Sequence, residues 1–461
     1  MSEIATITAA SAAFAAGTLT PSEALERVLE RIAEKDGIHH AIAESNTERA
    51  RESAARSDER WRAGAPIGPL DGVPITVKER LAVAGLPQTN GTLAHEPVVA
   101  EENDPTVDRM LEAGAVVVAT TSVPDFSATA SGVSTRYGVT RNAWNPAWNS
   151  GGSSSGSGVA AALGYGALHL GNDIGGSIRV PAAMNGVFGF KPSFGRVPMR
   201  NVYFGRAAGP LARTVRDAAI AMSYLSLPDR RDCWSAPYQE IAWHDLDLDA
   251  ASLRVAVCTD LQEGKLVDPR IVEAVHAAGR VFAAGGAHVE HVGPYLSRDY
   301  VSQGQGRFLS ANRWTMLHDD PHVTDLGSAD PDLVAALSSI ESASAIDLIR
   351  SINQIIPLVR ETCALLDAYD IVLSPVVGFL PGAAESTQMR EVSTHAVFSR
   401  PVSAAGAPAA SINCGFADDG RPIGLQIAAS RWEDLRVLRA AHWYEARRGA
   451  AATPDWSALD G

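Results

Sequence analysis

Two glycine-rich turns around a run of very small residues constrain this sequence more than any other feature. The segment from Gly151 to Pro181 reads GGSSSGSGVAAALGYGALHLGNDIGGSIRVP, with Ser153 in its first turn and Ser177 near its end. Glycine lets a backbone approach another backbone or a ligand closely, and consecutive free N–H groups at such a turn can form an anion-binding nest. The segment therefore predicts serines beside donors that can stabilise an oxyanion, often the largest single contribution to catalysis.

Three other interpretations of this Gly/Ser-rich segment compete. A flexible linker would lack the small apolar residues from Val159 to Leu163, which are typical of a packed helix. A P-loop ends in Gly-Lys-Ser/Thr, and the next lysine is Lys191. The G-x-S-x-G elbow of α/β-hydrolases would make Ser154 the nucleophile, but it follows a hydrophobic strand, and residues 145–150 are turn-like. We therefore expect a packed helix of small residues between the two turns, with His169 inside it.

Composition narrows the function classes and the compartment. The 461 residues carry a formal net charge of −14, which argues against a nucleic-acid partner because phosphate binding needs a basic patch. The four cysteines are scattered, without metal-ligand spacing. The first residues lack the basic region of a signal peptide, and no apolar run reaches the roughly 18 residues of a membrane span. We expect a cytoplasmic protein with no metal, cofactor, nucleic-acid or membrane partner.

Helix and strand patterns alternate along the chain. Thr20-Pro-Ser-Glu23 is a capping box with proline at the first helical position, and it predicts a helix that ends near Gly37. A short apolar strand from Val73 to Val77 leads to Lys78. Residues 294–345 are less regular. The alternation predicts an α/β fold, in which Lys78 and the next residue, Glu79, point to opposite faces of their strand.

Lys78, Gly151-Gly-Ser-Ser154 and Gly175-Gly-Ser-Ile-Arg179 together resemble the amidase signature family. The likeness extends to Gly209-Pro-Leu-Ala-Arg-Thr-Val215 and Gly415-Phe-Ala-Asp-Asp-Gly-Arg-Pro-Ile-Gly-Leu-Gln426, and it covers most of the chain. The resemblance implies one large α/β domain in which a mixed, twisted sheet is sandwiched between helix layers. It also implies a serine hydrolase with a Ser-cisSer-Lys triad, no cofactor and an acyl-enzyme intermediate.

The resemblance also implies roles for individual residues. Ser177 corresponds to the nucleophile, Ser153 to the bridging serine whose peptide bond is cis, and Lys78 to the base. The remaining assignments are the amides of Ile174, Gly175, Gly176 and Ser177 as the oxyanion hole, Ser154, Asp173 and Arg179 as supporting residues, and Ser127, Ala128 and Thr129 as the wall of the substrate pocket.

The chemistry of a lysine base is consistent with these roles. A serine hydroxyl needs a base to attack at neutral pH, and lysine can serve only when it is neutral. Burial without a carboxylate partner lowers the pKa of a lysine. A lysine at a strand end is, by itself, more typical of the surface. Two positions depart from the family pattern, Asn172 in place of threonine and Ser150 in place of proline, and we expect neither to touch the proton relay.

The resemblance leads us to expect the following organisation and function. Residues 1–461 form one domain, made of an N-terminal helical layer (1–64), a catalytic core (65–220) around the segment 151–181, a variable cover region (225–365) and the C-terminal part of the core (366–447). The expected protein is a monomeric or homodimeric amidase for small-molecule amides, with room for aryl or other bulky groups and with esters and carbamates (urethanes) as further substrates. The alternatives are a glutamine-hydrolysing amidotransferase subunit that works with a partner chain and a catalytically silent binding protein.

Overall fold

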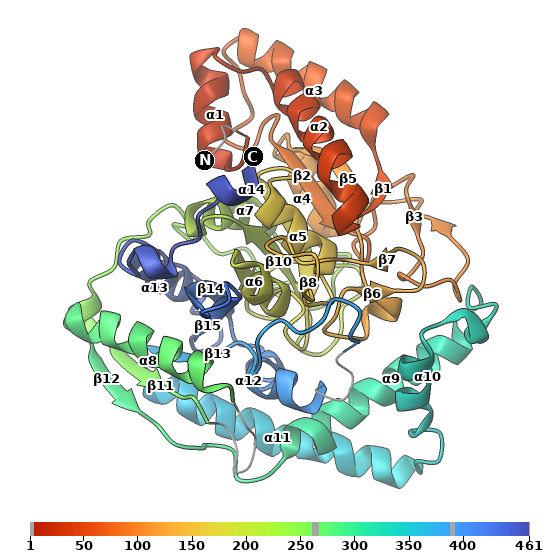
Figure 1. Ribbon diagram of the computed structural model, residues 1–461, viewed down its shortest axis with the longest axis vertical. Coiled ribbons are helices and arrows are strands. Elements are labelled where there is room, and N and C mark those ends of the chain that lie inside the picture. Colours follow the sequence, from red (N-terminus) through yellow and green to blue (C-terminus); the bar gives the residue numbers. More distant parts are fainter. Residues whose placement is uncertain (1–3, 261–266, 388–391, 461) are drawn as a thin grey trace.

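The chain folds around one long twisted sheet with helices on both faces (Figure 1). The computed structural model describes residues 4–260, 267–387 and 392–460. In this part of the chain eleven strands form the main sheet, in the spatial order β1 (Ile42–Ser45), β5 (Val116–Thr121), β2 (Pro74–Lys78), β8 (Leu168–Asp173), β10 (Ala207–Ala212), β9 (Phe188–Lys191), β14 (Ala409–Phe416), β15 (Pro422–Ala428), β13 (Ile371–Pro375), β11 (Arg254–Val257) and β12 (His288–His291). β2 is parallel to both of its neighbours, whereas β8 and β10 are antiparallel. The mixed sheet confirms the predicted α/β fold.

Two helix layers bury the two faces of this sheet. One layer consists of α1 (Ile7–Ala16), α2 (Pro21–His39), α3 (Thr47–Arg62), α4 (Pro105–Glu112), α7 (Val215–Leu225), α8 (Pro269–Ala284) and α13 (Asp434–Glu445), whose apolar side chains share one large core with the strands. The other layer contains α5 (Ser155–Leu163), α6 (Arg179–Asn185), α11 (Ala345–Ala368) and α12 (Val392–Ala404). Two peripheral helices, α9 (Arg307–Asp319) and α10 (Pro331–Ser338), lie beside the second layer, as Figure 1 shows.

The N-terminal helices form as their capping sequences predict. The Thr20 side chain accepts a hydrogen bond from the Glu23 amide at 3.2 Å, and the Glu23 carboxylate accepts one from the Thr20 amide at 2.8 Å. This capping box confirms the predicted start of α2. Further along α2, Arg31 forms an ion pair with Asp460 at 3.2 Å. The short terminal helix α14 (Ser457–Asp460) is therefore tied to the N-terminal layer.

Two predictions of secondary structure were wrong. The helix of small residues ends at Leu163, where Gly164 adopts a φ of +69°, and His169 lies in strand β8. β8 forms because β2 and β10 pair with it on both sides, a tertiary effect that the local sequence does not reveal. Residues 294–345, predicted to be less regular, contain α9 and α10.

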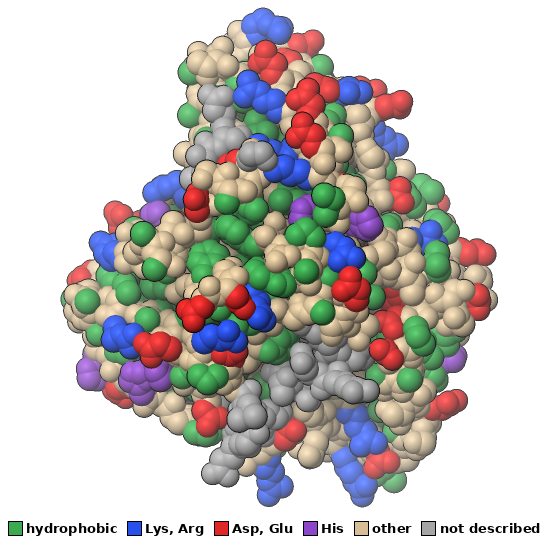
Figure 2. Space-filling model, viewed as in Figure 1, with side chains coloured by type: hydrophobic (Ala, Val, Ile, Leu, Met, Phe, Trp, Pro, Cys, Tyr) green, Lys and Arg blue, Asp and Glu red, His purple; other side chains and the backbone are tan. Residues whose placement is uncertain are grey.

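The surface shows no large patch of one charge on the face seen in Figure 2, where acidic and basic side chains are interspersed. None of the helices in the described ranges is both long enough and apolar enough to cross a membrane.

Candidate active site

The carboxyl ends of β2 and β8 lie side by side and define the site. The two strands are parallel, with Val77 opposite Leu170, so both chains leave the sheet at the same edge. Lys78 is the last residue of β2, and Asp173 is the last residue of β8. The glycine turn before α5 and the glycine turn between β8 and α6 meet above this edge, because the Ser154 amide donates to the Ser177 carbonyl at 3.1 Å.

The Lys78 amine is buried away from solvent and faces two polar oxygens. Its Nζ lies 2.9 Å from the Ser153 hydroxyl and 2.9 Å from Oδ1 of Asn172, and the side chain has no exposed surface. Burial lowers the pKa of Lys78 well below its usual range, and the positive charges of Arg80 and Arg206 lower it further. Neither oxygen in contact with the amine belongs to a carboxylate. The surroundings thus favour a neutral lysine.

Asn172 corrects one expectation from the sequence. We expected this departure from the family pattern to stay clear of the proton relay, but its amide oxygen is a direct partner of Lys78 Nζ. Asn172 belongs to strand β8, where it lies opposite Ala208 of β10. Its side chain reaches Lys78 at the end of the neighbouring strand β2. An amide oxygen accepts a hydrogen bond without adding negative charge, so it holds the amine without raising its pKa as a carboxylate would.

The first glycine turn presses Ser153 against a neighbouring loop. The peptide bond between Gly152 and Ser153 is cis, as the resemblance implies. A Cβ at position 152 would collide with the carbonyl oxygen of Ser131, so only glycine fits this close approach. Ser154 is fully buried at the start of α5, and its hydroxyl lies 3.4 Å from the Asn172 carbonyl. The hydrolase-elbow interpretation requires Ser154 to contact the substrate. Its burial keeps Ser154 out of reach of a substrate.

The second glycine turn presents Ser177 and a set of backbone donors. Ser177 is partly exposed, and its hydroxyl makes no hydrogen bond to any described residue, Ser153 included. In the same part of the chain, the amides of Ile174, Gly175 and Ser177 have no intramolecular acceptor. The Gly176 amide, in contrast, donates to Asp173 Oδ1 at 2.8 Å. Three of the four amides of the predicted oxyanion hole are therefore available to a ligand.

A buried ion pair fixes the shape of this turn. Arg179 and Asp173 have no exposed side-chain surface and form two hydrogen bonds, of 2.9 Å through Nε and 2.8 Å through Nη2. The Asp173 carboxylate also accepts hydrogen bonds from the amides of Gly176, Ile178 and Arg179. The charge of Arg179 and these donors outweigh the effect of burial and lower the pKa of Asp173 to about 2. The carboxylate stays ionised and holds the loop across the neutral range.

Three partners of Arg179 come from the C-terminal part of the chain, and the sequence alone did not assign them. Arg179 donates to the Ser399 carbonyl at 3.1 Å, to the Ser403 hydroxyl at 2.8 Å and to Oε1 of Gln426 at 2.6 Å. The Ser399 hydroxyl also donates to the Gly175 carbonyl at 2.6 Å. Gln426 ends a motif quoted for the resemblance, whereas two serines four residues apart on a helix carry no sequence signal.

The loop around Ser127, Ala128 and Thr129 lies next to the first glycine turn. Gly152 contacts Ala130 and Ser131, which directly follow these three residues. Ser127 has a φ of +53°, and its hydroxyl is buried without a partner among the described residues. Positive φ values are rare for residues other than glycine and concentrate at functional sites. Their assignment to the substrate pocket stays a prediction.

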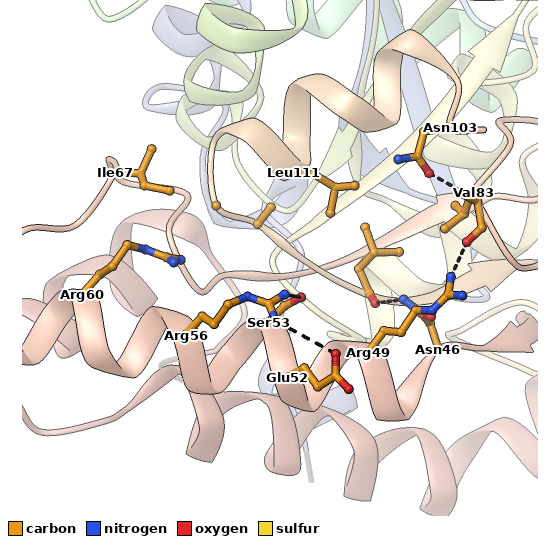
Figure 3. Close-up of a pocket in the computed structure, with 14 residues that line it drawn as sticks. Asn46, Arg49, Glu52, Ser53, Arg56, Arg60, Ile67, Val83, Asn103 and Leu111 are labelled. Carbon is orange, nitrogen blue, oxygen red and sulfur yellow. Dashed lines mark hydrogen bonds and ion pairs between the residues drawn. The ribbon is translucent and has the colours of Figure 1, made fainter. Parts of the chain in front are cut away.

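Two polar cavities contain arginines, and only one belongs to this site. The cavity in Figure 3, of about 450 Å³, contains none of the predicted site residues, and Arg49, Arg56 and Arg60 face it from α3. Arg60 pairs with Asp71, and Arg49 donates to the Ala84 carbonyl. The other cavity, of about 400 Å³, is partly lined by Arg80, Tyr203 and Arg206. None of the predicted site residues lines this cavity either, but Arg80 lies two residues after Lys78 and Arg206 directly precedes Ala207, which pairs with Asp173, so this second cavity adjoins the site.

No metal site accompanies these groups: within the described ranges, no three His, Cys, Asp or Glu side chains are arranged to hold an ion.

Comparison with known proteins gives a consistent result across the whole chain. The family described as Amidase matches residues 23–438. An acylamidase of Rhodococcus erythropolis is 31% identical over 453 residues, which cover 95% of this chain and 94% of that protein. A glutamyl-tRNA(Gln) amidotransferase subunit of Synechococcus sp. (strain CC9311) is 30% identical, over 93% of this chain and 94% of that one. The crystal structure of a bacterial aryl acylamidase superposes with a TM-score of 0.90 at 25% identity, over 99% of this chain and 98% of that one.

Proposed function

This chain belongs to the amidase signature family and is a hydrolase of C–N bonds other than peptide bonds, and we propose that it cleaves a carboxamide through Lys78, Ser153 and Ser177. The observation that supports this proposal most is the contact of 2.9 Å between a solvent-free lysine amine and the Ser153 hydroxyl. A buried amine without a carboxylate partner can accept a proton near neutral pH. The lysine therefore supplies the base that a serine nucleophile needs.

The proposed reaction begins with Ser177. Its oxygen attacks the amide carbonyl while its proton passes to Ser153, and the Ser153 proton passes to Lys78. The amides of Ile174, Gly175 and Ser177 stabilise the oxyanion that forms, a contribution of roughly 3–4 kcal/mol per donor. The tetrahedral intermediate then collapses, the proton returns along the same path to the leaving amine, and an ester remains on Ser177. Water attacks this ester by the same relay and frees both the acid and the serine.

The hydroxyls of Ser177 and Ser153 must come within hydrogen-bond distance for this transfer. They form no hydrogen bond to each other within the part of the chain that the structure describes. Catalytic hydrogen bonds are often long without substrate and shorten in the complex. We propose that substrate binding turns the free Ser177 hydroxyl toward Ser153. The substrates we propose are aryl or other bulky amides, with esters and carbamates as further classes, and the aryl acylamidase and acylamidase relatives support the amides.

The test compares two neighbouring serines. Ser177→Ala removes the proposed nucleophile and should abolish hydrolysis of an aryl amide such as 4-nitroacetanilide, together with the mass increase of an acyl-enzyme. Ser154→Ala removes the hydroxyl that the elbow interpretation would use, and it should retain turnover. Full turnover by Ser177→Ala with a dead Ser154→Ala variant would falsify the proposal.

A second candidate is a glutamine-hydrolysing chain of an amidotransferase, supported by the 30% identity to the Synechococcus protein. That function needs glutamine hydrolysis and a partner chain that receives the ammonia. Size-exclusion chromatography of the protein co-purified from its host distinguishes the two candidates. A stable complex with a second chain, together with release of ammonia from glutamine, would favour this function. A single species that cleaves aryl amides and leaves glutamine intact would favour the amidase.

A further inference from the structure

Four arginines around the candidate site have no ion-pair partner among the described residues. Arg80 follows β2, Arg206 precedes β10, Arg313 lies on α9 and Arg400 lies on α12. Within this part of the chain, the four side chains make a single hydrogen bond, from the Arg206 guanidinium to the Asn201 carbonyl at 3.2 Å. Arg400 is 7% exposed, and its Nε is buried without a partner. A buried charge is costly unless it is paired, so this arrangement needs an explanation.

Buried arginines elsewhere in the chain are paired. Arg196 lies 3.3 Å from Asp434, and Arg213 lies 2.7 Å from Asp460. Arg179 of the catalytic turn has Asp173. These pairs show that a fold with a net charge of −14 supplies carboxylates to its interior guanidinium groups. Arg400 therefore differs from the three other arginines that the described structure buries, whereas Arg80, Arg206 and Arg313 are partly buried.

Their positions connect them to the catalytic turns. Nε of Arg400 lies 3.5 Å from the position that a Cβ atom on Gly175 would occupy. Gly175 belongs to the predicted oxyanion hole. Arg80 and Arg206 line the cavity of about 400 Å³ that adjoins Lys78. Arg313 follows Asn312, another residue of this cavity wall. Arg80 also lies two residues after Lys78, and Arg206 directly precedes Ala207, which pairs with Asp173 at the start of the second glycine turn.

Tyr203 packs against the aromatic ring of Phe308 and the guanidinium group of Arg206. Its ring stacks on Phe308, with centroids 5.6 Å apart and planes within 5°, and the Arg206 guanidinium lies 5.5 Å from its centre. The Tyr203 hydroxyl is buried and has no hydrogen-bond partner in the described chain. Burial raises the pKa of the Tyr203 hydroxyl to about 12, and the positive charges of Arg206 and Arg313 oppose this rise. Among the described residues, the Tyr203 hydroxyl thus lacks an acceptor beside the Arg206 guanidinium, and Arg313 lies on α9, the helix that carries Phe308.

One carboxylate, that of Asp320, lines the same cavity as Arg80 and Arg206. Asp320 and Glu79 attract Arg80, and Asp320 also pairs with His95 at 3.4 Å. Asp299 attracts Arg400. Burial and the neighbouring arginines lower the pKa values of Arg206 and Arg313 to about 10, and no carboxylate of the described chain acts on either. The uncompensated charge is concentrated at Arg206 and Arg313.

We propose that Arg206, Arg313 and the Tyr203 hydroxyl bind a carboxylate carried by the amide substrate. This inference rests on the proposed amidase function and names the substrate class, an amide with a free carboxylate away from the scissile bond. A planar guanidinium binds a carboxylate with two parallel hydrogen bonds, which gives orientation as well as affinity. The phenol hydroxyl supplies a third donor. The bound anion offsets the repulsion among the arginines and places the amide carbonyl at Ser177.

The test uses matched substrate pairs in which a methyl group replaces the carboxylate. One pair places the carboxylate on the acyl side, the mono-4-nitroanilide of succinic acid against butyric acid 4-nitroanilide. The second pair places it on the amine side, 4-acetamidobenzoate against 4-acetamidotoluene. In at least one pair, wild-type protein should prefer the charged substrate in kcat/KM by roughly 10- to 100-fold, the range expected for a charge-assisted hydrogen bond. Added salt should reduce this preference.

Arg206→Gln and Arg313→Gln should each reduce that preference about tenfold or more. The readout is the ratio of the two kcat/KM values, because loss of Arg206 also removes a charge that lowers the Lys78 pKa. The assays are therefore run at a pH where the rate no longer changes with pH. There, a change in the Lys78 pKa does not alter the ratio. Arg280→Gln is the matched control, since Arg280 is exposed on α8 and paired with Glu273, and it should keep the wild-type ratio.

A binding measurement separates this inference from the proposed function. Calorimetry on Ser177→Ala, with and without Arg206→Gln, compares 4-acetamidobenzoate with 4-acetamidotoluene and needs no turnover. Tighter binding of the carboxylate that is lost with Arg206→Gln supports the inference, even if no amide is hydrolysed. Equal rates for both members of each pair, equal binding of both compounds, or a preference that survives both arginine variants would overturn it, even if Ser177 proves to be the nucleophile.

Discussion

Two buried lysines at the ends of two strands of the same sheet have different surroundings. Lys78 ends β2 and Lys191 ends β9, and neither side chain has any exposed surface. Burial lowers the pKa of both, that of Lys191 to about 7. The Lys191 amine donates to the carbonyl oxygens of Pro192 at 2.9 Å and Ala407 at 2.6 Å. The Lys78 amine instead lies against a hydroxyl and a side-chain amide oxygen.

The comparison shows that burial alone does not distinguish a catalytic lysine. A carbonyl oxygen can only accept a hydrogen bond, so Lys191 has no neighbour from which to take a proton. The Ser153 hydroxyl can both accept and donate, and it belongs to the turn beside Ser177. The partner, and not the lowered pKa, separates the proposed base from a lysine that joins two loops. Four predictions test this difference, from the largest expected effect to the smallest.

The first prediction replaces each lysine with methionine, which has a similar length and no charge. Lys78→Met should reduce kcat by about 10²–10⁴-fold, the usual contribution of a general base. Lys191→Met should keep a rate close to that of wild type, although two carbonyls lose their donor. Initial rates on an aryl amide, with circular dichroism to confirm folding, provide the measurement. If both variants lose activity equally while folded, the distinction between the two lysines is wrong.

The second prediction changes the other partner of Lys78. Asn172→Asp places a carboxylate 2.9 Å from the amine, and an opposite charge at such a distance raises a lysine pKa by about 1–3 units. Because the base must be neutral, activity should rise with pH in the wild type, and in the variant this rise should move to higher pH. At a pH on the rising limb, the rate should fall about 10- to 10³-fold. A pH–rate profile of each protein is the measurement, and superimposable profiles would contradict the prediction.

The third prediction concerns stability and Lys191. The folded-state pKa is lowered to about 7, whereas an unfolded lysine titrates near 10.4. Between these values the unfolded chain binds more protons, so the contribution of Lys191 to stability grows as pH rises from about 7 to about 10. The urea midpoint of wild type, relative to Lys191→Met, should therefore increase over this interval. Parallel midpoints for the two proteins across this pH range would refute the assignment.

The smallest effect is expected for Asn172→Thr, which restores the residue usual in the family. The threonine hydroxyl also offers an uncharged acceptor to Lys78, so the charge of the site is unchanged. We expect a rate within a few-fold of wild type and an unshifted pH profile. A large loss of activity would mean that the longer amide side chain of Asn172 positions Lys78, in addition to accepting its hydrogen bond.

Local sequence signals predicted much of the fold and of the site. The capping box at Thr20, the two glycine turns and the alternating pattern of helices and strands each depend on neighbours along the chain. The strand that ends at Lys78 was predicted for the same reason. β8 was missed, because its six residues Leu-His-Leu-Gly-Asn-Asp173 follow a helix closely and take their strand conformation by pairing with β2 and β10.

The chemical identity of the site was determined by the sequence: two serines in glycine turns, a lysine at a strand end and an aspartate six residues before an arginine. Only the tertiary structure decided their surroundings. It placed Asn172 beside Lys78, brought Ser399 and Ser403 to the catalytic turn, and gathered four arginines without ion-pair partners in the described chain from four segments. The physical reason is that desolvation and Coulomb interaction depend on distances in space, and residues far apart in the chain acquire those distances only when the sheet is assembled.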